Sequence, residues 1–317
     1  MEAVTDVVFR HVVQRAGAPD VFFTEFANAT GWVHAGDKAI AGRLLKTGDE
    51  HPLVAQIWGG EPGDMEQFAA HCARLGFDGI DINMGCPAKS AIKSGGAALI
   101  RRPDVAVAAI HAAKTAGLPV SVKTRLGYTY VEEWREWLRT LLEQDIVNLT
   151  IHLRTKKEMS KAPAHYELIG DIVMLRDTVA PHTLLMINGD IRDRGHGLAL
   201  AGAHPGVNGI MIGRGVFANP FCFAAGDTGY LHSQNNLEQN KAISIDDDSV
   251  TARYTELFDL LNYHLDLFDR YQPQTGRPFE TLKRFFKIYI KGFDGAKELR
   301  DQLMHAASTD EVRRIIM

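Results

Sequence analysis

The 317-residue chain contains only three cysteines, Cys72, Cys86 and Cys222, and they lie far apart. No CxxC pair or cysteine–histidine spacing is present, so the sequence indicates neither a zinc or iron–sulfur site nor a disulfide framework. The odd count fits a reducing compartment, and we expect a cytoplasmic protein.

Long apolar runs and an excess of positive charge are also missing. No apolar segment approaches the ~18 residues that a membrane span needs, and MEAVTDVVFR lacks the pattern of a secretion signal. The formal net charge is −4, so any nucleic-acid site must be a local one. A hydrophobic content of 45% with 23% charged residues is typical of a globular protein with room for one large domain and one small one.

Seven short apolar runs recur between residues 21 and 223, separated by amphipathic stretches such as 64–75, 103–116 and 131–144. The runs are VFFTEF (21–26), LVAQIWG (53–59), GIDINMG (79–85), PVSVKTRLG (119–127), NLTIHLRT (148–155), TLLMINGD (183–190) and GIMIGRG (209–215). Strands that alternate with helices predict βαβ units and a parallel sheet. Nearly continuous apolar strands are expected when helices cover both faces.

Seven strands are one fewer than a closed (β/α)8 barrel requires. Residues 4–15 have a helical pattern with no strand before them. We therefore predict an α/β fold, a (β/α)8 TIM barrel whose first strand lies upstream of Met1. The alternative, an open doubly wound sheet, would need a GxGxxG-type turn after an early strand, and the sequence has none.

The pattern changes after Phe223. Residues 226–245, which include SQNNLEQN, are polar and rich in turn formers, and predict a linker. The remainder has only helical patterns, at about 248–271, 278–291, 294–306 and 308–316. We therefore expect a barrel (1–225), a linker (226–245) and a small all-α domain (246–317).

Polar side chains lie near the C-terminal ends of five predicted strands, the end at which barrels build their active sites. Because side chains alternate along a strand, pairs of them share a face. The set is Gln56, Asp81 with Asn83, Lys123 with Arg125, His152 with Arg154, and Asn188 with Asp190. Without a carboxylate cluster suited to a metal, it fits a flat heteroaromatic cofactor with amide-like edges.

The last two runs end in NGD (188–190) and GRG (213–215). Loops after the last barrel strands commonly bind phosphate through backbone N–H groups and a helix N-terminus. Gly213 and Gly215 permit close approach and Arg214 adds a cation, although glycines also serve tight turns. A phosphate beside a flat ring predicts FMN.

Cys86 lies where the run 79–85 ends in Gly-Cys-Pro, so we interpret it as a catalytic thiol rather than a small buried filler. Cys72 has a helical context and Cys222 an aromatic one, and we expect both to pack in the core.

Together these motifs resemble those of the tRNA-dihydrouridine synthases. The matching segments are MEAVTD with FR (1–6 and 9–10), NMGCPAK (83–89) followed by GGAAL (95–99), VKTRLG (122–127), IHLRT (151–155), NGD (188–190), IGRG (212–215) and LKRFFKIYIKGF (282–293).

The resemblance implies an FMN-containing barrel and a helical tRNA-binding domain that reduce specific tRNA uridines to 5,6-dihydrouridine, with NADPH as reductant. It makes Cys86 the proton donor and Asn83 the residue that orients the uracil, with Lys89, Arg125 and Arg154 as further substrate-binding residues. The expected FMN-binding residues are Met1, Glu2, Gln56, Lys123, His152, Asn188, Asp190, Gly213 and Arg214. We expect tRNA as the partner, no protein partner, no membrane association and a monomer.

For the tRNA, a basic stripe is predicted on helix 278–291, where lysines recur every four residues; a plain solvated face is the alternative. Its residues are Lys283, Arg284, Lys287 and Lys291, and Lys89, Lys93, Arg101 and Arg102 add charge near the cysteine. Two other functions stay open: an FMN barrel oxidoreductase that acts on a small pyrimidine or enone, and a non-catalytic RNA-binding protein.

Overall fold

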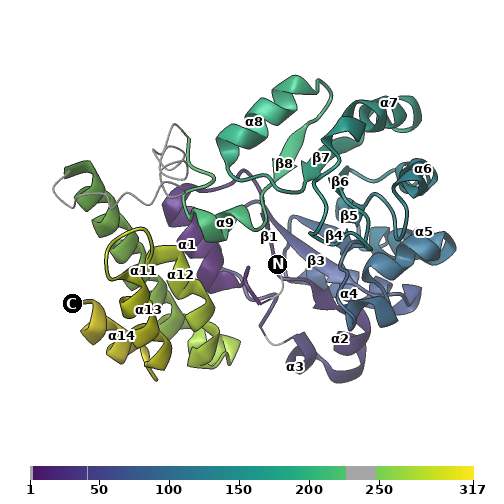
Figure 1. The fold of residues 1–317 in the computed structure, drawn as a ribbon. Coiled ribbons are helices and arrows are strands. Elements are labelled where there is room, and N and C mark those ends of the chain that lie inside the picture. Colours follow the sequence, from purple (N-terminus) through teal and green to yellow (C-terminus); the bar gives the residue numbers. More distant parts are fainter. Residues whose placement is uncertain (1–2, 41, 226–247) are drawn as a thin grey trace.

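The computed structural model describes residues 3–40, 42–225 and 248–317. Its centre is a parallel sheet with the strand order β1-β3-β4-β5-β6-β7-β8, and β2 also pairs with β3. The strands are β1 (Phe22–Phe23), β2 (Ala27–Asn28), β3 (Leu53–Trp58), β4 (Gly79–Asn83), β5 (Val120–Arg125), β6 (Asn148–His152), β7 (Leu184–Asn188) and β8 (Gly209–Met211). Every predicted run forms strand structure, and helices surround the curved sheet (Figure 1).

The first run (21–26), predicted as one strand, forms only the short β1, and a second short strand, β2, follows it along the same edge of β3. Between them, Thr24 Oγ1 accepts a hydrogen bond from the main-chain N–H of Gln56 at 3.0 Å. A side-chain hydroxyl thus replaces the main-chain acceptor at this point, and the strand is interrupted. The next residue, Glu25, is fully buried.

β1 and β8 form the two ends of the strand order, and no strand pairing joins them within the described residues. The described residues therefore provide no strand for the position between β8 and β1. The architecture is that of a (β/α)8 barrel, as predicted. That the first strand precedes Met1 stays a prediction.

Most helices follow the strands that the sequence pattern places before them. They are α2 (Ala29–Ala35), α3 (Asp37–Ile40), α4 (Pro62–Arg74), α5 (Pro103–Lys114), α6 (Trp134–Leu142), α7 (Ile169–Val179), α8 (Arg194–Ala203) and α9 (Gly215–Ala218). α4 and α5 each begin with proline, whose missing N–H costs nothing in a first turn. No helix in the described ranges is long and apolar enough to cross a membrane.

The C-terminal part is helical, as expected. It contains α11 (Asp248–Thr275), α13 (Ala296–His305) and α14 (Thr309–Ile316), and between the first two lie two 3-10 turns, Phe279–Thr281 and Lys283–Phe285, and α12 (Phe286–Tyr289). The predicted linker, 226–245, lies outside the described residues, so the division into domains stays a prediction.

The single helix predicted over 278–291 is wrong, because two 3-10 turns and the short α12 take its place. Phe285, Phe286, Ile288, Tyr289 and Ile290 are all buried. Arg284 and Lys287 are exposed and Lys283 and Lys291 are half-buried, so the cations keep their predicted spacing on the less buried side. Its cations are directed to separate partners. Lys283 Nζ donates to Met304 O, Arg284 Nη1 donates to Ala3 O, Lys291 Nζ donates to Ala218 O, and Lys287 Nζ lies 5.5 Å from the Phe217 ring centroid.

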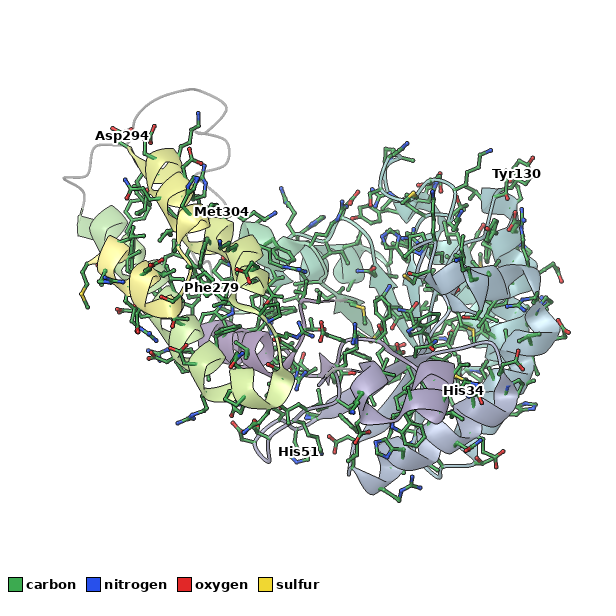
Figure 2. The ribbon with its side chains drawn as sticks, turned by 90° about the horizontal axis from the view of Figure 1, so that it is seen from below. His34, His51, Tyr130, Phe279, Asp294 and Met304 are labelled. Atoms are coloured by element: carbon green, nitrogen blue, oxygen red, sulfur yellow. The ribbon has the colours of Figure 1, made fainter. Side chains whose placement is uncertain are left out.

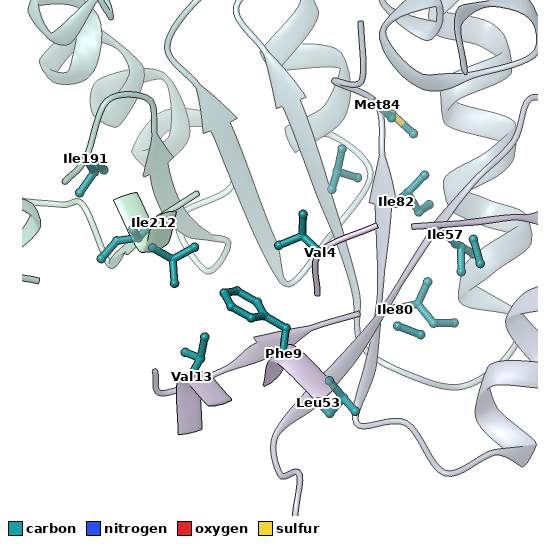
Figure 3. Packing of buried hydrophobic residues seen from close by; sticks show 14 of the residues in the cluster. Val4, Phe9, Val13, Leu53, Ile57, Ile80, Ile82, Met84, Ile191 and Ile212 are labelled. Carbon is teal, nitrogen blue, oxygen red and sulfur yellow. The ribbon is translucent and has the colours of Figure 1, made fainter. Parts of the chain in front are cut away.

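Helix α1 (Val7–Gly17) lies between the barrel and the C-terminal helices (Figure 1). The side chain of Asp6 caps its N-terminus by accepting a hydrogen bond from Phe9 N–H at 2.9 Å. Phe9 packs against Phe217, His264 and Phe285, with ring centroids 4.8–6.2 Å away. Figure 3 shows Phe9 in the same buried cluster as side chains of the strands, so one hydrophobic core joins both parts of the chain.

Acid is expected to destabilise the protein through His264. Burial lowers the pKa of this histidine from 6.5 to about 3, so the unfolded chain binds a proton that the folded chain excludes. Stability is therefore full well above pH 6.5 and falls as the pH drops through this value, by roughly 1 kcal/mol between pH 7.5 and 5.5 from this one group. Urea unfolding should show this loss in the wild type and lack it in His264→Phe. The same substitution at exposed His182 is the control, and equal pH slopes for all three proteins would contradict the prediction.

Candidate active site

The polar side chains predicted at the strand ends form a connected hydrogen-bond network. Gln56 Nε2 donates to Asp81 Oδ2 at 2.7 Å, and Asn83 Nδ2 donates to Gln56 Oε1 at 3.2 Å. Ser121 Oγ donates to Asp81 Oδ1 at 2.6 Å. Burial raises the pKa of Asp81, while its hydrogen bonds oppose the shift. The network fixes the amides of Gln56 and Asn83 and leaves each a second N–H for a ligand.

Cys86 is held on a short loop by two hydrogen bonds to its own main-chain N–H and C=O groups. Asn83 Oδ1 accepts the N–H of Cys86 at 2.9 Å, and Cys86 O accepts the N–H of Ala97 at 3.0 Å. Gly96 has φ +55°, and a Cβ there would lie 2.9 Å from Cys86 O, so only glycine fits where the loop closes. The strand end therefore fixes Cys86 through its backbone and leaves the side chain partly exposed.

The other two cysteines behave as the sequence predicts. Cys72 and Cys222 are buried, and burial raises the pKa of each thiol from 9 to about 12. A thiol that resists ionisation inside apolar surroundings is chemically inert. Cys86 is thus the accessible thiol of the three, and no disulfide joins them.

Lys123 places a cation at the centre of the rim. Its Nζ donates to Asn188 Oδ1 at 3.4 Å, and Asn188 Nδ2 donates to Met211 O at 2.7 Å. Burial, followed by the charge of Arg125, lowers the pKa of Lys123 from 10.5 to about 8. Within the described residues this ammonium makes one long hydrogen bond, so a ligand with an acceptor or a negative charge would satisfy it.

His152 is neutral at the same rim. Burial, together with the nearby charges of Lys123, Arg125 and Arg154, lowers its pKa from 6.5 to about 2. Its Nδ1 is buried and has no hydrogen-bond partner among the described atoms. Buried polar atoms of folded proteins are nearly always paired, so an unpaired one at a strand end indicates a ligand-binding position.

Asp190 connects two arginines near the NGD and GRG loops. Both its oxygens accept hydrogen bonds from the Arg154 guanidinium, and Oδ1 also accepts from Arg214 Nη2 at 3.0 Å. Arg154 is 2% exposed and also donates to Ala162 O, so its guanidinium braces the rim. Arg214 keeps 64% of its side chain exposed and is the cation of this group that an anion could reach.

Arg125 joins two loops instead of extending into open space. Its Nε donates to Gly85 O at 2.7 Å, and Nη1 donates to Thr155 O and Met159 O, both at 3.2 Å. Burial lowers its pKa from 12.5 to about 10, and the nearby Cys86 opposes the shift. Arg125 therefore fixes the cysteine loop against the loop that follows β6.

The remaining predicted site residues are spread more widely. Lys89 is exposed on the cysteine loop, and Gly213 has open space in front of its Cα, since a Cβ there would meet only Asn188 Nδ2 at 3.9 Å. Met1 and Glu2 lie outside the described residues. The prediction missed Ser121, although it shares a strand face with Lys123 and parity could have identified it. Among the described residues, no cluster of His, Cys, Asp and Glu is arranged to hold a metal ion.

Comparison with known proteins adds an independent finding. The model of the family described as "Dihydrouridine synthase (Dus)" matches residues 1–316. A protein named "Probable tRNA-dihydrouridine synthase 2" from Bacillus subtilis is 55% identical over 318 residues, which cover 100% of this chain and 91% of that protein. "Probable tRNA-dihydrouridine synthase" proteins of Staphylococcus aureus strain Mu50 and Staphylococcus epidermidis strain RP62A are 51% and 50% identical, with 100% of this chain and 90% of each relative covered.

Proposed function

This chain belongs to the dihydrouridine synthase family, and we propose that it reduces specific uridines in tRNA to 5,6-dihydrouridine, with FMN as cofactor and NADPH as reductant. The observation that carries the proposal is the position of Cys86. Its loop closes over the strand ends beside Lys123 and Arg125, and it is the accessible thiol of the chain.

The rim residues fit FMN. Lys123 is a buried cation with a weakly satisfied ammonium, His152 has an unpaired ring nitrogen, and the amides of Gln56 and Asn188 are held in place. These groups match the carbonyl and nitrogen edge of a flat ring. Bound FMN supplies a hydride to one carbon of the uracil C5=C6 bond.

The phosphate of FMN would lie near Gly213 and Arg214. Gly213 permits close approach, and Arg214 offers an exposed guanidinium. Asp190 is also an expected cofactor residue. Its oxygens accept hydrogen bonds from Arg154 and Arg214, so we assign Asp190 the role of orienting the Arg214 side chain. Backbone contacts from Met1 and Glu2 complete the proposed set.

Cys86 would donate a proton to the other carbon of the double bond, as a general acid. The loop fixes its backbone through Asn83 and Ala97, which places the sulfur reproducibly. Loss of the proton leaves a thiolate. Cys86 and the cations of Lys123 and Arg125 lie close enough to shift the pKa of both cations, so their positive charges would stabilise that thiolate.

The substrate must reach this rim as a base extruded from the RNA stack. We assign recognition of its uracil edge to the remaining N–H of Asn83, with Lys89 as an exposed cation for the adjoining backbone. Arg125 and Arg154, the other expected substrate residues, would act by holding the loops around the base. In this proposal residues 1–225 form the catalytic domain, 226–245 the linker and 246–317 the tRNA-binding domain.

The proposal predicts that the purified chain carries flavin absorbance and forms dihydrouridine in unmodified tRNA when NADPH is added. Nucleoside mass spectrometry of the digested tRNA measures the product, and NADH in place of NADPH tests the reductant. Flavin-loaded protein that leaves tRNA unchanged but consumes free pyrimidines or enones would support the small-molecule oxidoreductase instead. Protein that binds tRNA without flavin would support the non-catalytic alternative.

A further inference from the structure

Three loops at the C-terminal ends of β4, β5 and β6 carry a cluster of cations and tyrosines that we call the rim surface. It is defined by Arg101, Tyr128, Tyr130, Lys156, Lys157 and Lys161. Tyr130 keeps 65% of its surface exposed. Figure 2 shows Tyr130 on the opposite side of the molecule from the C-terminal helices, where Phe279 and Met304 are labelled.

The rim surface is locally basic in a chain whose net charge is −4. Residues 86–102 contain four lysines and arginines and no carboxylate, and residues 155–162 contain three lysines and one glutamate. No ion pair to these cations occurs within the described residues. The nearby Glu133 accepts the main-chain N–H groups of Tyr128 and Tyr130 at 2.7 and 2.8 Å, and it closes that turn.

Cations and aromatic rings alternate on this surface. The Arg101 guanidinium lies 3.9 Å from the ring centroid of Tyr128, and Lys156 Nζ lies 4.9 Å from it. Lys157 Nζ lies 5.7 Å from the Tyr130 ring. Main-chain bonds hold the loops together, since Lys156 N–H donates to Gly127 O and Lys157 N–H to Tyr128 O, at 2.8 and 2.9 Å.

The same loops are connected to the reactive centre. Arg125 bonds Gly85 O, next to Cys86, and also Thr155 O and Met159 O in the loop that carries the lysines. A polymeric substrate with one unit over Cys86 would therefore place its adjoining units near the rim surface. The C-terminal cations near 283–291 are directed instead to main-chain oxygens and an aromatic ring.

We propose that the rim surface binds the RNA strand that adjoins the extruded uridine, with phosphates on the lysines and a base stacked on Tyr130. This rests on the proposed function. Positive side chains neutralise phosphates, and exposed aromatic rings stack on bases of any sequence. The tRNA is thus held on two sides of the barrel mouth, by the rim surface and by the C-terminal domain.

The test measures binding of unmodified tRNA transcript by filter binding over a series of salt concentrations. Lys157→Ala/Lys161→Ala removes two phosphate contacts, and the slope of log K against log salt should become shallower by about 1.4–1.8. The matched control is Lys46→Ala/Lys114→Ala, because these lysines bond Gly76 O and Gln144 O, which precede β4 and β6 at the other end of the barrel. The control should keep the wild-type slope.

Tyr130→Ala should weaken tRNA binding about fivefold or more and leave the salt slope unchanged, because a stacking contact is lost without a charge. Tyr130→Phe should restore the affinity. If Lys157→Ala/Lys161→Ala binds with the wild-type affinity and slope, the rim proposal is overturned while dihydrouridine formation by the wild type still stands. If the wild type itself forms no dihydrouridine, the proposed function fails, and the salt series still reports on RNA binding.

Discussion

Cys86→Ala should lower the rate of dihydrouridine formation about 10²–10⁴-fold, the usual contribution of a positioned general acid. The substitution removes one sulfur from a loop whose shape depends on backbone hydrogen bonds to Asn83 and Ala97, so the loop should persist. Single-turnover reduction of tRNA, followed by nucleoside mass spectrometry, measures the rate. Flavin absorbance of the same protein reports whether the barrel mouth is intact.

Two controls separate chemistry from packing. Cys222→Ala changes a buried thiol and should keep the rate of product formation. Cys86→Ser keeps a proton at the same position on a weaker acid. Its rate of dihydrouridine formation should therefore lie between those of the wild type and Cys86→Ala. Full activity of Cys86→Ala would remove residue 86 from the reaction and, with it, the main support for the mechanism.

Arg277→Met should lower the free energy of unfolding by about 3–5 kcal/mol, the cost of breaking a buried ion pair. Arg277 lies between α11 and the 278–291 segment and pairs with Asp6, Nη1 to Oδ2 at 3.2 Å, and with Glu25. Its side chain is 14% exposed, and those of the two carboxylates are 11% and 0% exposed. Methionine would leave both carboxylates without this guanidinium. Because Asp6 also caps α1, the loss would reach the helix between the two parts of the chain.

Urea unfolding of the wild type and of Arg277→Met measures this effect. Arg313→Met is the matched control, because Arg313 pairs with Asp266 and Asp269, whose side chains are 69% and 44% exposed. Solvent screens such pairs, and the control should lose no more than about 1 kcal/mol. Equal losses in the two variants would show that the Arg277 cluster does not stabilise the docked C-terminal helices.

Much of the barrel could be read from the sequence, because each strand is a short apolar run bounded by turn residues. The first run shows the limit of this signal. The hydroxyl of Thr24 takes the place of a main-chain acceptor. This hydrogen bond requires the N–H of Gln56, which lies 32 residues away in the sequence. The 278–291 segment shows a second limit. Its cations keep helical spacing and stay exposed or half-buried, but 3-10 turns replace most of the predicted α-helix, and the periodic pattern does not distinguish the two.

Parity along the strands correctly placed the candidate site residues at the rim, but it could not assign their partners. Arg125 and Arg154 share the inward faces with Lys123 and His152, and the sequence predicts contact with substrate for both arginines. A guanidinium reaches several ångströms from its strand. Its partners are carbonyl groups of neighbouring loops, such as Met159 O and Ala162 O, whose positions only the folded chain defines.

The sequence by itself determined the order of strands, the family motifs and the distinction between one partly exposed and two buried cysteines, because these depend on local pattern. Tertiary structure alone decided which polar groups are already satisfied and which, such as His152 Nδ1, are left for a ligand. It also brought Arg277 to Glu25 across 252 residues and assembled the rim surface from three loops. Hydrogen bonding and charge act over a few ångströms in space, so only the folded chain sets which groups meet.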